Sequence, residues 1–258
     1  MRIAFISDIH ANLPALEAVL QGIDAQAPDT IFCLGDLVNQ NVWNNEVVEL
    51  IRQRGIRSVR GNHDNGIALG KKFFKFSYTF PEAKKWGIEA IDYTQRTILP
   101  ENRVFLGQLP LTIRLLIKQK DRAPFTVLLV HGSPYDIHES LNRFMPKQRF
   151  RSILEDSNID LLVCGNTHCP YHYSFGWEKD GKTIYRHVLN PGSVGRPKDG
   201  DWRPCYALVT FDPTRNLSES PDAVQVDFYR ISYDLGKAVK AIRHSTLSVY
   251  YGSCLITG

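Results

Sequence analysis

Apolar runs and helix-like repeats alternate along the first sixty residues. Two apolar runs of four residues predict buried strands at positions 3–6 and 31–34, and a third strand is predicted at 56–59. Between them, apolar residues at helical spacing predict a helix that Asn12 caps and a second helix over residues 45–54 that ends at Gly55. Strands that alternate with helices across short loops indicate a parallel sheet covered by helices.

The alternation stops after the third strand. A helix over residues 82–97, opened by Pro81, and a further turn at 101–107 predict a helical insertion at about 66–108. Beyond it, the pattern predicts neighbouring strands at 111–117 and 125–130, a helix at 147–156 and a strand at 160–164. The later apolar runs predict strands and a final helix, at 171–175, 183–189, 205–211, 223–229 and 234–244. Consecutive strands of this kind indicate a second, partly antiparallel sheet packed on the first, and we expect a single domain over residues 1–258.

Composition and charge exclude several classes of protein. A hydrophobic content of 43% is ordinary for a globular domain, and no apolar stretch approaches the ~20 residues of a membrane span. The net charge of +4 suits a polyanionic substrate but is too small for stable nucleic-acid binding. Five cysteines without a CxxC pair are typical of reduced thiols, and we expect a cytoplasmic protein. The first seven residues run straight into a polar motif, so we expect no removable leader there.

Five short segments carry polar side chains in turn-like settings. They are Asp8-Ile9-His10, Gly35-Asp36, Gly61-Asn62-His63-Asp64, His131-Gly132 and Gly165-Asn166-Thr167-His168. Four of the five directly follow apolar runs that predict strands, and open α/β enzymes place their active sites at the carboxyl ends of strands. Carboxylate and amide oxygens together with imidazole nitrogens are the donors that hold divalent transition metals. The sequence therefore predicts a metal-dependent hydrolase, with phosphate esters as the favoured substrates.

The spacing of these residues indicates how a metal pair would be held. Asp8 and His10 are two positions apart, so they fall on one face of an extended backbone. Asp36 follows a glycine, and its two oxygens could each take a different ion, at the separation of ~3.5–4 Å used for phosphoryl displacement. His131 and His168 supply imidazoles, and Asn62 offers a neutral amide oxygen.

Three further residues beside these ligands are candidates for catalysis or substrate binding. His63 has the reach to contact the leaving-group oxygen, so we expect it to act as a general acid. Asp64 would either orient that imidazole or anchor the loop through backbone amides. Arg60 would direct positive charge at the phosphate, with a structural ion pair as the alternative.

The order of these motifs resembles the calcineurin-type metallophosphoesterase superfamily from residue 1 to about residue 212. The segments at 190–195 and 199–201 resemble its small prokaryotic branch, which includes phosphodiesterases and asymmetric diadenosine tetraphosphate hydrolase-like proteins. The resemblance implies a four-layer α/β/β/α sandwich with two mixed sheets. It also implies one metal site formed by Asp8, His10, Asp36 and His168, and a second formed by Asp36, Asn62, His131 and Asn166.

The chain departs from the superfamily at two places. The family usually has histidine where this chain has Asn166, and an amide is a poorer ligand than imidazole for a late transition metal. The second site is therefore expected to bind weakly, to prefer manganese over iron, nickel or zinc, or to stand partly empty. The arginine that protein phosphatases carry shortly after Gly-Asp is also missing from residues 37–41.

We therefore expect a cytoplasmic two-metal phosphoesterase that acts on a small phosphodiester or a dinucleoside polyphosphate. The insertion and the loop at 192–201 would frame its pocket. A protein-phosphatase-like phosphomonoesterase, a nuclease and a catalytically weak metal-binding scaffold are the alternatives. The scaffold is favoured only by Asn166, and the presence of His63 and Asp64 argues against it. The sequence leaves the native substrate and the oligomeric state open.

Overall fold

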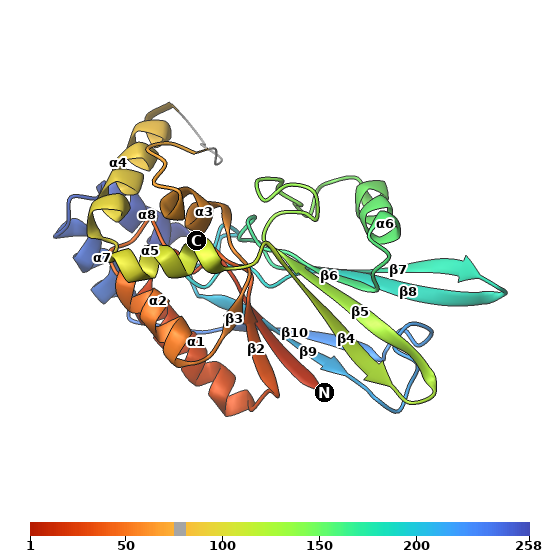
Figure 1. Ribbon diagram of the computed structural model, residues 1–258. Helices are drawn as coiled ribbons and strands as arrows, with labels where there is room; N and C mark the ends of the chain where they lie inside the picture. The colour runs from red at the N-terminus through yellow and green to blue at the C-terminus, as the bar shows by residue number, and fades with distance from the viewer. Residues whose placement is uncertain (75–80) are drawn as a thin grey trace.

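The computed structural model describes residues 1–74 and 81–258 (Figure 1). Within these residues, the strands form two five-stranded sheets. The first sheet, in the order β10-β9-β1-β2-β3, contains β1 (Arg2–Ile6), β2 (Thr30–Cys33), β3 (Arg57–Ser58), β9 (Cys205–Phe211) and β10 (Val224–Arg230). The second sheet, in the order β4-β5-β6-β8-β7, contains β4 (Thr112–Gln119), β5 (Arg122–Val130), β6 (Leu161–Val163), β7 (Tyr171–Lys179) and β8 (Lys182–Asn190).

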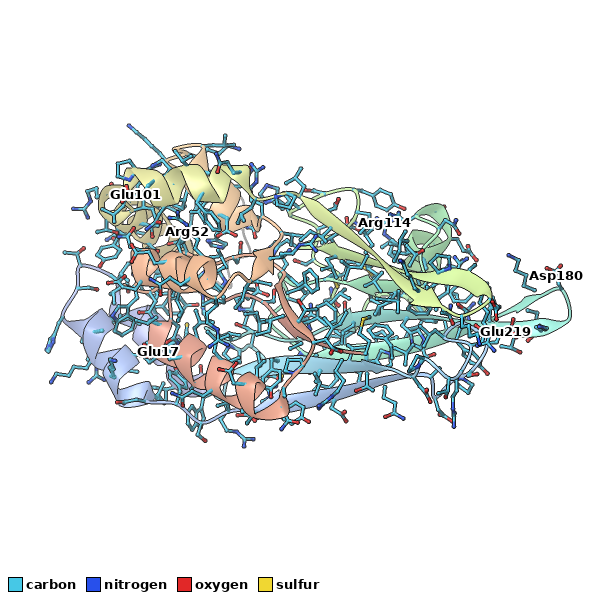
Figure 2. The ribbon with its side chains drawn as sticks, turned by 60° about the horizontal axis from the view of Figure 1, so that its bottom comes forward. Glu17, Arg52, Glu101, Arg114, Asp180 and Glu219 are labelled. Atoms are coloured by element: carbon cyan, nitrogen blue, oxygen red, sulfur yellow. The ribbon has the colours of Figure 1, made fainter. Side chains whose placement is uncertain are left out.

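The helices cover the outer faces of these sheets. They are α1 (Leu13–Gln26), α2 (Asn44–Gln53), α3 (Asn62–Ala68), α4 (Pro81–Thr97), α5 (Pro100–Gln108), α6 (Lys147–Asp156), α7 (Leu235–Arg243) and α8 (Val249–Thr257). Figure 1 shows α6 over the second sheet and most of the other helices on the side of the first. Their polar faces point outward, as Glu17 of α1, Arg52 of α2 and Glu101 of α5 illustrate (Figure 2).

Separate clusters of buried apolar side chains hold the layers together. Ile6 packs with Leu16 of α1 between the first sheet and its helices. Phe5 and Val127 belong to the cluster between the two sheets, and Phe150 of α6 packs on the outer face of the second sheet. Both sheets combine parallel and antiparallel pairs, for example β1 with β2 and β1 with β9. The predicted α/β/β/α sandwich with two mixed sheets is confirmed.

The strand assignment differs from the prediction in one respect. We expected the strands after residue 171 to build the second sheet together. Instead, β7 and β8 join the second sheet, whereas β9 and β10 return to the first and pair antiparallel with β1. The return brings the loop that precedes β9 against the end of β1, next to Asp8.

Two helices were not expected. The segment that begins at Asn62 is the first turn of α3 rather than an open loop, and α8 follows the predicted final helix. Residues 75–80 of the predicted insertion lie outside the described residues. Its described part contains the last residues of α3 and the whole of α4 and α5. None of the described helices combines the length and the apolar character needed to cross a membrane.

Candidate metal centre

The structure brings the predicted ligands together at one edge of the sandwich, where the parallel strands of both sheets end. Asp8 and Asp36 follow β1 and β2 of the first sheet, and Asn62 opens α3. From the second sheet, His131 follows β5 and His168 follows β6. Donor atoms of Asp8, His10 and His168 lie within 4.8 Å of one another, and so do those of Asp8, Asp36 and His131. All of these side chains are buried.

The backbone at this edge adopts conformations that are costly for ordinary residues. Asp8, His10, Asp36, Asn166 and His168 all have positive φ angles, between 46° and 67°. Left-handed backbone outside glycine is uncommon and concentrates at functional sites, where surrounding structure holds it in place. Here the N–H groups of Asp8 and His10 donate to the carbonyl oxygens of Gly35 and Asp36. The two loops therefore hold each other in the geometry that turns their side chains inward.

Asp36 lies at the centre of the cluster. Its Oδ2 is 3.4 Å from His131 Nε2 and 3.7 Å from His10 Nε2. Its Oδ1 accepts a hydrogen bond of 2.8 Å from the backbone N–H of His63. We expected each carboxylate oxygen to take a different ion. In the structure Oδ2 alone faces imidazoles from both sides, because a backbone amide engages Oδ1.

Backbone carbonyl groups orient two of the imidazoles. His131 Nδ1 lies 2.7 Å from Leu34 O, and His168 Nδ1 lies 2.5 Å from Arg196 O. A carbonyl oxygen only accepts, so each Nδ1 carries a proton and each ring directs its Nε2 toward the cluster. His168 Nε2 faces His10 Nε2 at 3.2 Å, and His131 Nε2 faces Asn62 Oδ1 at 2.9 Å.

These donors fit divalent metal ions. Asp8 Oδ1 is buried without a hydrogen-bond partner among the described residues, while Oδ2 accepts from Ser7 Oγ and the backbone N–H of Asn166. Burial, together with the nearby charge of Asp36, raises the pKa of Asp8 to about 6. A buried carboxylate with a raised pKa lacks a compensating cation, and facing lone pairs on neighbouring imidazoles call for one. Carboxylates with imidazoles suit manganese, iron, nickel or zinc.

Asn166 lies at the edge of the same site. Its Nδ2 is directed at the loop after β5, 3.2 Å from Ser140 Oγ and 3.4 Å from Glu139 O. No hydrogen bond joins its amide oxygen to the other candidate ligands in the described part of the chain. The structure thus places Asn166 beside the cluster, and its role as a ligand stays a prediction.

His63 and Asp64 occupy different positions relative to the cluster. The His63 ring is buried, with Nε2 3.9 Å from Asp36 Oδ2. Asp64 does not orient this imidazole: its carboxylate accepts the backbone N–H groups of Asp36, Leu37 and Gly61 at 2.8–2.9 Å. Of the two roles considered for Asp64, the geometry matches the loop anchor. Gly61 is required beside it, because a Cβ there would lie 2.0 Å from Asp36 Oδ1.

Asn39 orients His63 instead, and the sequence analysis missed it. Asn39 Nδ2 lies 2.9 Å from His63 Nδ1. The backbone N–H of Gln40 donates to Asn39 Oδ1 at 2.8 Å, which fixes the amide so that Nδ2 must be the group facing His63. The Gln40 amide nitrogen lies farther away, 3.4 Å from His63 Nε2. The shorter contact with Asn39 therefore makes Nδ1 the acceptor and places the proton of the neutral ring on Nε2, on the side of Asp36. Asn39 lies three positions after Asp36, and no sequence motif identifies it.

Arg60 is engaged by groups outside the cluster. Its guanidinium donates to Leu109 O at 3.0 Å and to Asn65 Oδ1 at 3.2 Å. It does not line the cavity beside the metal cluster. Its side chain connects α3 to the end of α5, and a contact of Arg60 with the phosphate stays a prediction.

The cavity beside the cluster has a volume of about 320 Å³. Asp36, His63 and His168 form its floor, and Ser140, Asn142 and Thr167 form part of its wall. Four further lining residues had no part in the sequence analysis: Arg196, Lys198, Tyr250 and Tyr251. For Arg196 and Lys198, the sequence offered only the general expectation that residues 192–201 frame the pocket.

Comparison with known proteins agrees with this geometry. Residues 1–170 match the model of the calcineurin-like phosphoesterase family. The chain is 35% identical to protein MJ0912 of Methanocaldococcus jannaschii over 99% of its own length and 98% of that protein. It is 25% identical to phosphodiesterase YfcE of Escherichia coli over 78% of its length and 83% of that protein.

Among solved structures, the chain resembles the crystal structure of a metallophosphoesterase from Sphaerobacter thermophilus. The two are 31% identical with a TM-score of 0.72, and the match covers 100% of this chain and 99% of the other. The family match spans well over half of the chain and contains each of the candidate ligands. The chain belongs to the calcineurin-like phosphoesterase family.

Proposed function

We propose that this metal-dependent phosphoester hydrolase uses two divalent ions to cleave a small phosphodiester or a dinucleoside polyphosphate. One observation carries the proposal of two ions. Asp36 Oδ2 lies within 4 Å of His10 Nε2 on one side and of His131 Nε2 on the other. Among the described residues, Asp36 belongs to two of the three groups of candidate metal ligands. A carboxylate in that position can bridge a pair of ions.

The residues of the chain divide into two candidate sites. Asp8, His10, Asp36 and His168 would hold one ion, and Asp36, Asn62, His131 and Asn166 the other. Ions held there supply Lewis acidity toward the phosphate and a source of nucleophile at neutral pH. Manganese is the favoured metal, because oxygen donors make up much of the second site.

His63 is the proposed proton donor. Its Nε2 carries the ring proton, lines the cavity and lies on the side of Asp36. Asn39 fixes this tautomer, and Asp64 fixes the loop that presents the ring. A proton placed there can reach the ester oxygen as it departs.

The enclosing walls support a small substrate. A cavity of about 320 Å³ is at the lower end of small-molecule sites and is bordered by Ala83 of α4 and Tyr251 of α8. The phosphodiesterase relative favours a diester over a phosphoprotein. Within residues 37–41, where the arginine of protein phosphatases is missing, Gln40 lines the cavity. We further propose a cytoplasmic location, in keeping with five free cysteines, and neither a membrane nor nucleic acid as a stable partner.

A panel of metals and substrates tests the proposal. Chelated protein would be reloaded with manganese, nickel, iron or zinc and assayed on bis(p-nitrophenyl) phosphate, p-nitrophenyl phosphate and diadenosine tetraphosphate, with bound metal measured on the same samples. We expect activity to require metal, to rise as the second equivalent binds, and to favour the two substrates with bridging phosphates. Metal binding without hydrolysis of any of them would instead support the scaffold.

A further inference from the structure

Two positive side chains in the cavity form no ion pair with any of the described residues. Arg196 donates to Gln40 Oε1 at 2.6 Å, Tyr250 OH at 3.3 Å and Cys254 Sγ at 2.9 Å, all of them neutral groups. Lys198 Nζ has no hydrogen-bond or ion-pair partner among the described residues. Apart from Asp36, no carboxylate of the described residues lines this cavity.

By contrast, the two carboxylates on the same loop are paired with arginines. Arg203 forms an ion pair of 2.7 Å with Asp201, and Arg230 of β10 forms an ion pair with Asp199. The loop therefore carries carboxylates, but they face the arginines outside the cavity. The positive charges of Arg196 and Lys198 are therefore available to bind a negatively charged ligand that enters the cavity.

Backbone groups of both residues are bonded to His168, which ties the loop that carries the two cations to the metal centre. Arg196 O accepts from His168 Nδ1, and the backbone N–H of Lys198 donates to His168 O at 3.3 Å. The Arg196 guanidinium also lies 5.5 Å from the ring centres of Tyr250 and Tyr251. Burial and then the charge of Lys198 hold the pKa of His168 well below its usual value, so this ammonium group lies close to the metal ligands.

Two divalent ions already neutralise the charge of a single phosphodiester. Two additional uncompensated cations in the same small cavity would repel those ions unless the substrate brings further negative charge. We propose that Arg196 and Lys198 form a second anion-binding subsite, which takes a phosphate group adjacent to the one that is hydrolysed. The substrate class is then a phosphoester with at least two neighbouring phosphates. This inference rests on the proposed function.

Inhibition by two nucleotides that differ by one phosphate tests the subsite. Hydrolysis of bis(p-nitrophenyl) phosphate would be measured at saturating manganese in the presence of adenosine 5′-monophosphate or adenosine 5′-diphosphate. We expect the diphosphate to inhibit the wild type at least tenfold more strongly. A charge-assisted hydrogen bond contributes about 1.5–3 kcal/mol, which corresponds to roughly 10–100-fold in affinity.

The Lys198→Gln variant should lose most of this difference. The readout is the ratio of the two inhibition constants within each protein, which is independent of any change in basal activity, and Lys198→Arg should restore the preference. Lys240→Gln on the exposed face of α7 is the matched control. Equal inhibition of the wild type by the two nucleotides, or equal weakening of both by Lys198→Gln, would overturn the subsite. Lack of metal-dependent diester hydrolysis in the wild type would instead overturn the proposed function.

Discussion

At the scale of single residues, backbone groups rather than side chains do most of the orienting. Carbonyl oxygens select the tautomers of His131 and His168, and backbone amides hold Asp64 and one oxygen of Asp36. Donors arranged in this way are fixed before any ion binds, which limits the reorganisation that binding requires.

Replacement of His63 with alanine separates proton donation from metal binding. Metal content should be unchanged, and hydrolysis of an ester with a weakly acidic leaving group should fall by ~10²–10⁴-fold, the usual contribution of a positioned acid. The loss should shrink for a nitrophenyl ester, whose leaving group needs little help. His244→Ala, on the surface, serves as control. Equal losses on both esters would show that His63 positions the substrate or the ions instead.

Asn166 determines the expected strength of the second site. An amide is a poorer ligand than imidazole for a late transition metal. With Asn166 as the last ligand of the second site, purified protein should carry fewer than two metals per chain, and added manganese should raise its activity. Asn166→His should tighten the second site and reduce this dependence. The measurement is a metal titration of both proteins followed by activity. Tight binding of two ions by the parent, with no change on substitution, would contradict this account.

At the scale of elements, the loop before β9 clamps the end of β1. The backbone N–H of Gly195 donates to Asp8 O at 2.9 Å, and a Cβ on Gly195 would lie 1.7 Å from Ile9 O. Gly195→Ala should therefore displace Asp8 and His10, weaken the first metal site and cost about 1–3 kcal/mol of stability. Gly107→Ala, in α5 with its nearest contact at 3.6 Å, should do neither. Isothermal titration and denaturant unfolding of both variants check this, and unchanged metal affinity in Gly195→Ala would contradict the clamp.

The buried histidine of β8 predicts acid sensitivity. Burial, with a smaller effect of His172, lowers the pKa of His187 to about 3. The unfolded chain takes up this proton near pH 6.5 and the folded chain only near pH 3, so the contribution of neutral His187 is present above pH 6.5 and is lost as pH falls.

Stability should therefore decline through this window by up to about 1.4 kcal/mol per pH unit from this residue. Denaturant unfolding of chelated wild type and His187→Gln between pH 7 and 4 measures the effect, since chelation removes any contribution of bound metal. A steeper decline in wild type is expected. Parallel pH profiles would show that His187 is not held neutral.

The elements also show what could be predicted from the sequence. Strands with continuous apolar runs were found because burial dictates composition, and the polar residues after them led directly to the ligands. α3 was missed because Asn, Asp and Gly are weak helix formers. Asp64 stabilises its first turn by accepting the backbone N–H of Gly61, and it also accepts the backbone N–H groups of Asp36 and Leu37. α8 was missed because Val249, Tyr250 and Tyr251 favour strands in isolation, whereas packing against α7 decides the outcome. The positions of Arg196 and Lys198 beside the metal centre depend on such tertiary contacts and on the return of β9 to the first sheet, so the sequence alone did not reveal them.

At the scale of the whole molecule, two sheets from distant parts of the chain end at the same edge. The first sheet contributes Asp8 and Asp36, the second contributes His131 and His168, and the packing between the sheets aligns them. The central claim is that Asp36 joins these two halves into one dinuclear centre. Loss of the Asp36 carboxylate should therefore lower the metal affinity of both sites.

The number of manganese ions bound by wild type and by Asp36→Asn, with diester hydrolysis measured on the same samples, tests this claim most directly. Wild type should bind up to two ions as manganese is raised. The variant should lose affinity at both sites and several orders of magnitude of activity. Two ions bound by Asp36→Asn with unchanged affinity would contradict the bridge and the dinuclear centre built on it.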